Sequence, residues 1–133
     1  MVEELDFLYV PSRDVARDLW LFTEVLEGEL VFAIEAFGAR VAEVRIGRGG
    51  PRLLLADHLE ADGPVLVYRV ADLDVTLTEL ERRGWVPESR FGIPHGPCAS
   101  FRVPGGQRLA FYELSRPHVD EGLSGRVDFR PEP

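Results

Sequence analysis

The chain has 133 residues, 45% of them hydrophobic, and carries 23 acidic against 15 basic residues for a net charge of −8. This length and apolar content are enough for one autonomous domain that buries about two-thirds of its unfolded surface, which excludes a linker or disordered protein. The acidic balance, without any block of basic residues, also argues against nucleic acid as a partner.

The first half of the chain predicts a strand, a helix and three further strands. Their expected positions are residues 4–10, 13–26, 32–37, 40–46 and 52–56. Pro11 and Ser12 end the first strand, and Ser12 is a suitable N-cap for the helix that follows. Gly28 ends that helix, and the polar residues 57–63 connect the two halves of the chain.

The second half predicts the same order of elements. Their expected positions are a strand at residues 65–70, a helix at 72–83 and strands near 85–90, 98–103 and 107–113. Residues 115–133 contain repeated Pro and Gly and show no clear period. We expect this C-terminal segment to be extended and to lie on the surface or on a partner.

The two halves align with each other at a constant offset. Four positions recur 58 residues later: Phe7 as Val65, Asp14 as Asp72, Leu19 as Leu77 and Phe22 as Leu80. An internal repeat of a strand-helix-strands unit predicts two similar modules, residues 4–57 and 63–114, that share a sheet. Together with the C-terminal segment they form one domain over residues 1–133.

The low cysteine content and the absence of a long apolar run predict the cellular location. Cys98 is the single cysteine, so the chain has no internal disulfide framework and suits a reducing compartment. No apolar run approaches the roughly 20 residues that cross a bilayer, and the N-terminus enters a strand without a basic leader. We expect a cytoplasmic protein without a membrane partner.

Three stretches in order carry a family resemblance: Leu5-Asp6-Phe7, Val70-Ala71-Asp72-Leu73-Asp74 and Phe101-Arg102-Val103-Pro104-Gly105-Gly106-Gln107-Arg108-Leu109. With the internal repeat, they make residues 5–114 resemble the vicinal oxygen chelate superfamily, which includes glyoxalase I, extradiol dioxygenases and bleomycin-resistance proteins. The resemblance implies an α+β fold in which two βαβββ modules form a curled mixed sheet around a central cavity.

The resemblance also places four metal-ligand positions on this chain. They fall at Phe7, Leu54, Val65 and Ala110. None of these side chains has a nitrogen or oxygen donor of the kind that divalent metal sites require. We therefore expect the inherited metal site to be lost, and we expect no metal and no other cofactor.

Two interpretations of the central face remain open, a packed core and a ligand-accepting cavity. Alternation along the strands places five residues with polar tips on that face, which favours an apolar cavity with a few polar groups. They are Tyr9, Arg52, Arg69, Arg108 and Tyr112. The candidate ligand-binding residues are Phe7, Tyr9, Trp20, Leu54, Val65, His95, Arg108, Ala110 and Tyr112. His95, between Pro94 and Pro97, would be a polar group at the rim.

No catalytic constellation is evident among these residues. Glu113 has the opposite parity to Tyr112 and should point away from the cavity, so no general base is apparent there. Cys98 is expected to be a buried structural residue. The central arginines could either pair with the many carboxylates or bind an anionic ligand.

The sequence thus favours a metal-free small-molecule-binding protein, a homodimer like the bleomycin-resistance proteins that it resembles. An enzyme is the first alternative: a lyase, isomerase or dioxygenase of the same superfamily, or a metal-independent proton-transfer catalyst. A non-catalytic dimeric interaction protein is the second.

Overall fold

A computed structural model describes residues 1–36, 38–59 and 62–133. The first module contains β1 (Val2–Pro11), α1 (Val15–Trp20), the π-helical turn η1 (Leu21–Val25), β2 (Glu29–Ala36), β3 (Ala39–Arg45) and β4 (Arg52–Ala56). The second contains β5 (Val65–Val70), α2 (Leu73–Arg82), β6 (Ser89–Ile93), β7 (Gly96–Arg102) and β8 (Arg108–Glu113), and the short helix α3 (Val119–Leu123) follows it. The expected α+β class is confirmed.

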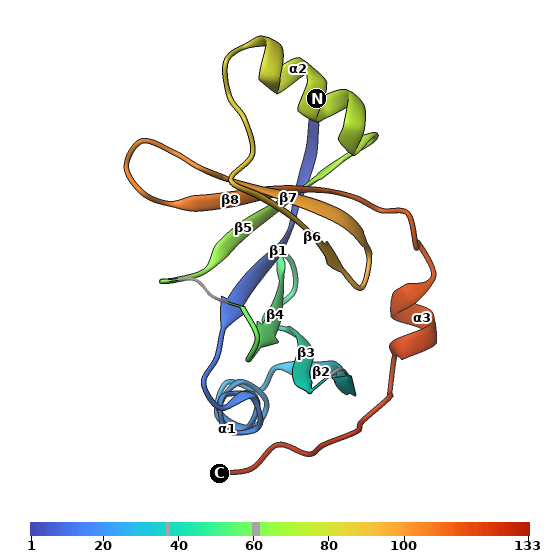
Figure 1. Ribbon diagram of the computed structural model, residues 1–133. Helices are drawn as coiled ribbons and strands as arrows, with labels where there is room; N and C mark the ends of the chain where they lie inside the picture. The colour runs from blue at the N-terminus through green and yellow to red at the C-terminus, as the bar shows by residue number, and fades with distance from the viewer. Residues whose placement is uncertain (37, 60–61) are drawn as a thin grey trace.

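One mixed sheet of eight strands joins the two modules, in the order β2-β3-β4-β1-β5-β8-β7-β6. Within each module the first strand pairs in parallel with the last, and the antiparallel pair β1 and β5 links the modules at the centre. The sheet curls strongly, with α1 near one end and α2 near the other (Figure 1). The sheet therefore has a concave inner face, formed by both modules, and an outer face covered by α1 and α2.

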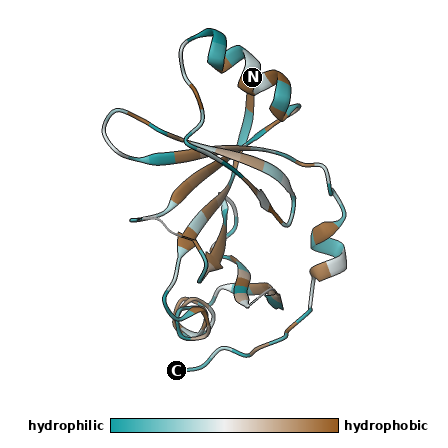
Figure 2. Cartoon of the chain, viewed as in Figure 1, coloured by the Kyte–Doolittle hydropathy of each residue, from teal (hydrophilic) through white to brown (hydrophobic). Residues whose placement is uncertain are grey.

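The alternation of side chains along the strands divides the core in three. The inner-face cluster contains alternate residues of the central strands, among them Phe7, Leu54 and Ala110. The intervening residues face outward and pack with α1 in one cluster and with α2 in another. The strands near the centre of the sheet carry much of the hydrophobic colouring in Figure 2, because central strands are buried on both faces.

The helix boundaries differ from those expected. Asp14, not Ser12, caps α1, because its side chain accepts a hydrogen bond from the backbone N–H of Arg17. Ser12 instead donates to the Asp18 carboxylate, 2.5 Å away. The predicted strand at 85–90 begins later, at Ser89, since the Trp85 ring packs against another aromatic ring at a centroid distance of 4.4 Å. The predicted strand end at Phe37 lies outside the described residues.

The C-terminal segment, residues 115–133, is mostly exposed and lies on the surface as expected, but it also contains a short helix and packs against its own chain. It leaves β8, forms α3 and then runs back beside the first module toward α1 (Figure 1). The backbone N–H of Ala33 donates to the Arg126 carbonyl, and the N–H of Asp128 donates to the Ala33 carbonyl. Phe129 packs in the cluster under α1. The segment thus satisfies the free edge of β2, which would otherwise expose unpaired backbone groups.

Among the described residues, no helix is both long enough and apolar enough to span a membrane.

Candidate functional site

The four positions at which the resemblance places metal ligands are packed together on the inner face. Phe7, Leu54, Val65 and Ala110 are all buried in the same cluster. Their side chains provide only carbon, so the residues at these positions do not fit the metal that the superfamily commonly uses. The packing also shows that any opening of the central face must lie beside these four residues rather than between them.

The other predicted ligand-binding residues lie in different surroundings. Tyr9 and Tyr112 are buried on the inner face, and the Tyr112 hydroxyl donates to the Asp6 carboxylate. Burial, followed by that hydrogen bond, raises the Tyr112 pKa. Arg108 pairs with Glu88 at 2.7 Å, and Trp20 belongs to α1, which packs on the outer face. The structure therefore does not bring the nine residues together around one point.

A polar cluster that the sequence analysis did not assemble lies on the inner face. It consists of Glu43 of β3, Arg52 of β4, His95 of the turn between β6 and β7, and Asp120 of α3. His95 Nε2 lies 2.8 Å from Asp120 Oδ1 and 3.3 Å from Glu43 Oε1. Glu43 is 0% and His95 1% exposed, whereas the Asp120 side chain is 25% exposed. The cluster is therefore buried at one end and reaches solvent at the other.

The turn that carries His95 is fixed by close packing. A Cβ at the following residue, Gly96, would lie 2.0 Å from the Glu113 carbonyl oxygen, so only glycine fits there. Arg116 holds the turn from the other side, donating from its backbone N–H to the His95 carbonyl and from its guanidinium to the Pro94 carbonyl. As a result the imidazole is directed inward against Phe7, with ring centroids 4.4 Å apart. His95 is thus fully buried, not at a rim.

Arg52 is the cation of the cluster. Its guanidinium lies over the Phe7 ring, 4.7 Å from the centroid. Its Nη1 is 3.4 Å from Glu43 Oε2 and also pairs with Asp120 Oδ2. Burial alone would lower the Arg52 pKa, but the charge of Glu43 and the hydrogen bond with Asp120 outweigh it and raise the pKa. Arg52 therefore remains a fixed positive charge beside two carboxylates.

The hydrogen bonds with His95 and Arg52 also act on Asp120. Burial would raise the pKa of its carboxyl group, but these two hydrogen bonds outweigh burial and hold the pKa below its usual range. Asp120 therefore stays ionised, and it fixes α3 against the inner face.

Two buried polar atoms of the cluster lack a hydrogen-bond partner among the described residues. They are Glu43 Oε1 and His95 Nδ1. Although Oε1 is close to His95 Nε2, the geometry does not form a hydrogen bond. Leaving a buried polar atom unsatisfied costs about 1–3 kcal/mol, and in a native structure it calls for an explanation such as a functional role.

Glu43, His95 and Asp120 also offer three donor atoms within 4.8 Å of one another, a spacing that a metal ion could use. Two features indicate that the cluster is built to hold the Arg52 guanidinium and a proton rather than a metal ion. Arg52 already binds both carboxylates, and a metal-bound histidine normally donates its second ring N–H to an acceptor, whereas His95 Nδ1 has none. The arrangement suits proton transfer next to a fixed positive charge.

Cys98 lies on the inner face but is chemically inert. Burial raises the pKa of its thiol to about 12, so almost no thiolate is present near neutral pH. The predicted structural role fits this environment. Glu113 points away from the inner face, as its parity indicated, and accepts a hydrogen bond from the Leu73 N–H at the start of α2.

Strand alternation had placed Arg52 on the central face, and Glu43 carried a signal in the sequence that the prediction did not use. Glu43 stands in the apolar run Val41-Ala42-Glu43-Val44 with the parity of the inward residue Val41, and a charge buried in a strand is costly unless it is paired. His95 was predicted as a polar group. Asp120 had no signal, because its position depends on the path of the C-terminal segment.

Comparison with solved structures finds this fold, a curled sheet built from two βαβββ modules, in other proteins. Methylmalonyl-CoA epimerase from Mycobacterium tuberculosis is similar, with a TM-score of 0.69 and 20% identity over 87% of this chain and 91% of that chain. A variant of the Streptomyces coelicolor epimerase in complex with 2-nitronate-propionyl-CoA has a TM-score of 0.71 and 13% identity, covering 87% and 97%.

A hypothetical protein from Bacillus halodurans is also similar, with a TM-score of 0.68 and 16% identity over 83% of this chain and 93% of that chain. The TM-scores of these three structures show a shared fold, and their low sequence identities show nothing beyond it. Comparisons with protein-family models and with the sequences of curated proteins give no match.

Proposed function

We propose that this protein is a metal-independent enzyme of the isomerase type, which removes and returns a proton next to a carbonyl group of a small molecule. The observation that supports it most is the buried pair Glu43 and His95, in which Glu43 Oε1 lies 3.3 Å from His95 Nε2. Glu43 Oε1 accepts no hydrogen bond from the described residues, and the same carboxylate lies beside the Arg52 guanidinium. The fold is shared with methylmalonyl-CoA epimerases, so methylmalonyl-CoA is the first substrate to test.

In this proposal each residue of the cluster has one role. The Glu43 carboxylate takes the proton from the carbon, and the electron pair of the C–H bond moves to the carbonyl oxygen. Arg52 stabilises the negative charge that develops on that oxygen, which is the contribution that a metal ion would otherwise supply. His95, between Glu43 and Asp120, passes protons between the buried carboxylate and the solvent-exposed end of the cluster.

Access to Glu43 requires α3 to move away from the inner face. Glu43 and His95 are covered, and the exposed part of the cluster belongs to Asp120 of α3 and to Arg52. The segment around α3 is held by backbone hydrogen bonds of Arg116 on one side and Gly125 on the other. Outward movement of α3 between these two points would open the cluster without unfolding the sheet.

Deuterium exchange in D₂O tests the proposal directly. The protein is treated with a chelator and incubated with methylmalonyl-CoA and with a panel of other 2-substituted acyl thioesters and 2-substituted carboxylic acids, and exchange at carbon 2 is followed by proton NMR. We expect exchange with at least one substrate, unaffected by the chelator. Glu43→Gln should lose at least about 100-fold, within the usual 10²–10⁴-fold contribution of a general base.

The matched control is Glu35→Gln, which removes a carboxylate from the exposed edge strand β2 and should leave exchange unchanged. Absence of exchange across the panel, or full exchange in Glu43→Gln, would contradict the proposal.

A metal-free small-molecule-binding protein is the second candidate. The observation that favours it is that Phe7, Leu54, Val65 and Ala110, at the middle of the sheet, offer neither a metal donor nor a general base. In that case Glu43, His95 and Asp120 would serve to fix α3 over a bound ligand. A thermal shift with a ligand that undergoes no exchange would support this candidate. The homodimer and the cytoplasmic location stay predictions.

A further inference from the structure

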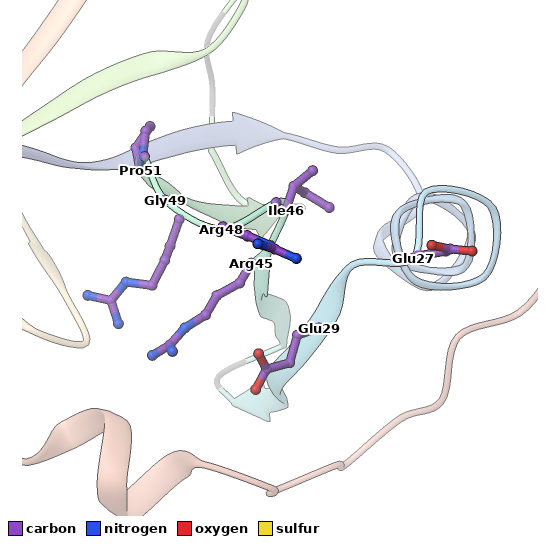
Figure 3. A pocket seen from close by; sticks show the side chains of 10 residues that line it. Glu27, Glu29, Arg45, Ile46, Arg48, Gly49 and Pro51 are labelled. Carbon is purple, nitrogen blue, oxygen red and sulfur yellow. The ribbon is translucent and has the colours of Figure 1, made fainter.

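A hollow of the surface lies at the loop between β3 and β4, next to the buried cluster. Its volume is about 630 Å³, within the range of small-molecule sites. It is lined by Glu27, Glu29, residues 45–51 and Arg52. Figure 3 shows the side chains of Arg45, Arg48 and Glu29 around this hollow. We call it the β3–β4 cleft.

Two arginines of the cleft have no partner among the described residues. Arg45 and Arg48 are exposed, and their guanidinium groups form neither an ion pair nor a hydrogen bond with the described part of the chain. Other arginines, such as Arg69, Arg102 and Arg126, pair with carboxylates. In a chain with a net charge of −8, two adjacent unpaired guanidinium groups are available for an anion from outside.

The backbone of the loop adds further donors. Gly47 and Gly50 have φ angles of 74° and 79°, in the region that favours glycine, so the loop turns sharply there. A Cβ at either position would meet no atom within 4 Å, so the loop is open to a ligand. Within the described part of the chain, no group accepts a hydrogen bond from the N–H groups of residues 48–50, and such N–H groups in a tight turn are suited to anions.

The cleft is continuous with the proposed active site through Arg52. The same side chain lines the cleft and contacts Glu43 and Asp120. A ligand in the cleft could therefore place one end near Arg52 and the other end against Arg45 and Arg48. Glu29 is the cross-strand neighbour of Arg45 and also lines the cleft, whereas Figure 3 shows Glu27 set apart from Arg45. These carboxylates weaken the binding of a bare anion and could accept hydrogen bonds from a larger ligand.

We propose that the β3–β4 cleft binds the phosphate or pyrophosphate group of the substrate. Several guanidinium and backbone N–H donors exceed what the two oxygens of a carboxylate can use, but they match the oxygens of a phosphate. This inference rests on the proposed function, because the ligand is a substrate only if the protein is an isomerase. It extends that function by naming the substrate class, a phosphorylated small molecule with a carbonyl group.

The experiment titrates inorganic pyrophosphate into the protein at low ionic strength and follows binding by calorimetry and by chemical shifts of the loop amides. We expect binding that the double variant Arg45→Gln/Arg48→Gln weakens at least about tenfold, equivalent to about 1.4 kcal/mol. Glu29→Gln should tighten binding a few-fold. The matched control is Arg13→Gln/Arg17→Gln. These two arginines are exposed at the start of α1 and form no ion pair within the described part of the chain. The control removes the same charge and should change affinity less than about twofold, since only screened long-range charge is altered.

Equal losses in the two double variants would show non-specific charge attraction and overturn the proposal. Tighter binding of malonate than of pyrophosphate would identify a carboxylate site instead, and absence of any binding would also overturn it. Because these measurements need no turnover, they separate the two hypotheses. Pyrophosphate binding without proton exchange would support anion binding in the β3–β4 cleft and contradict the isomerase activity. Proton exchange without pyrophosphate binding would support the isomerase activity and contradict anion binding in the cleft.

Discussion

His95 Nε2 lies 2.8 Å from Asp120 Oδ1, a contact between residues 25 positions apart that joins the β6–β7 turn to the C-terminal segment. Arg52 adds a second bond to the same carboxylate from the first module. Asp120 therefore connects three parts of the chain: both modules of the sheet and the segment that covers it. We expect the cover of α3 over Glu43 and His95 to depend on this side chain.

The first prediction concerns Asp120→Asn. The loss of charge-assisted bonds to His95 and Arg52 should lower the free energy of unfolding by about 1–3 kcal/mol, measured by urea denaturation. Hydrogen exchange in residues 115–124 should accelerate more than exchange in the sheet. Glu121→Gln is the control, because that side chain is 81% exposed and its ion pair is with His118 of the same segment. Equal exchange in the two variants would show that Asp120 does not hold α3.

The second prediction concerns pH. The pKa of Asp120 is lower in the folded protein than its ordinary value of 3.8, so its ionised form stabilises the fold above that value, and the contribution is lost as the pH falls through the lower folded pKa. The melting temperatures of the parent and Asp120→Asn should therefore differ by a constant amount near neutral pH and converge below about pH 3.8. Glu79, Glu88 and Asp128 also have lowered pKa values, but both proteins contain them. A difference that persists at the lowest pH would refute the assignment.

The third prediction concerns the packing of the inner face. Ala110 has no exposed surface and lies in the same cluster as Phe7 and Val65, so Ala110→Phe should overpack the core and cost about 1–3 kcal/mol. A melting curve measures this directly. Ala36→Phe, at an exposed position of β2, is the control and should change stability little. An unchanged melting temperature for Ala110→Phe would show that the centre of the sheet has room for a ring, in favour of a ligand-binding protein.

The fourth prediction concerns metal ions. Arg52 already pairs with the two carboxylates that could hold a metal, so added Zn²⁺ should not raise the melting temperature of the parent protein. Arg52→Met removes that pairing, and Glu43, His95 and Asp120 should then bind Zn²⁺ and raise the melting temperature with the logarithm of its concentration. Arg52→Met/His95→Ala should lose the effect. Zinc stabilisation of the parent that disappears in His95→Ala would reveal a metal site in the natural chain.

Much of the fold could be predicted from the sequence because the responsible patterns are local. Alternation of apolar residues predicted the strands, and the recurrence of Phe7 as Val65 predicted that the two central strands are related. The sequence also showed that Phe7, Leu54, Val65 and Ala110 have no metal-donor atoms. The predicted boundaries were less accurate where a different side chain made the capping hydrogen bond, as Asp14 does in place of Ser12 at the start of α1.

Only the tertiary structure decided which polar side chains meet. Glu43, His95 and Asp120 come from a strand, a turn and a short helix, and no periodicity of the sequence relates them. Their meeting depends on the curl of the sheet, which directs the β6–β7 turn toward β3, and on the return of residues 115–133 to the free edge of β2. Local hydrogen-bonding and apolar patterns determine strands and helices, whereas the contacts of a buried charge follow from the path of the whole chain, because such a charge can be buried only where distant segments bring it a partner.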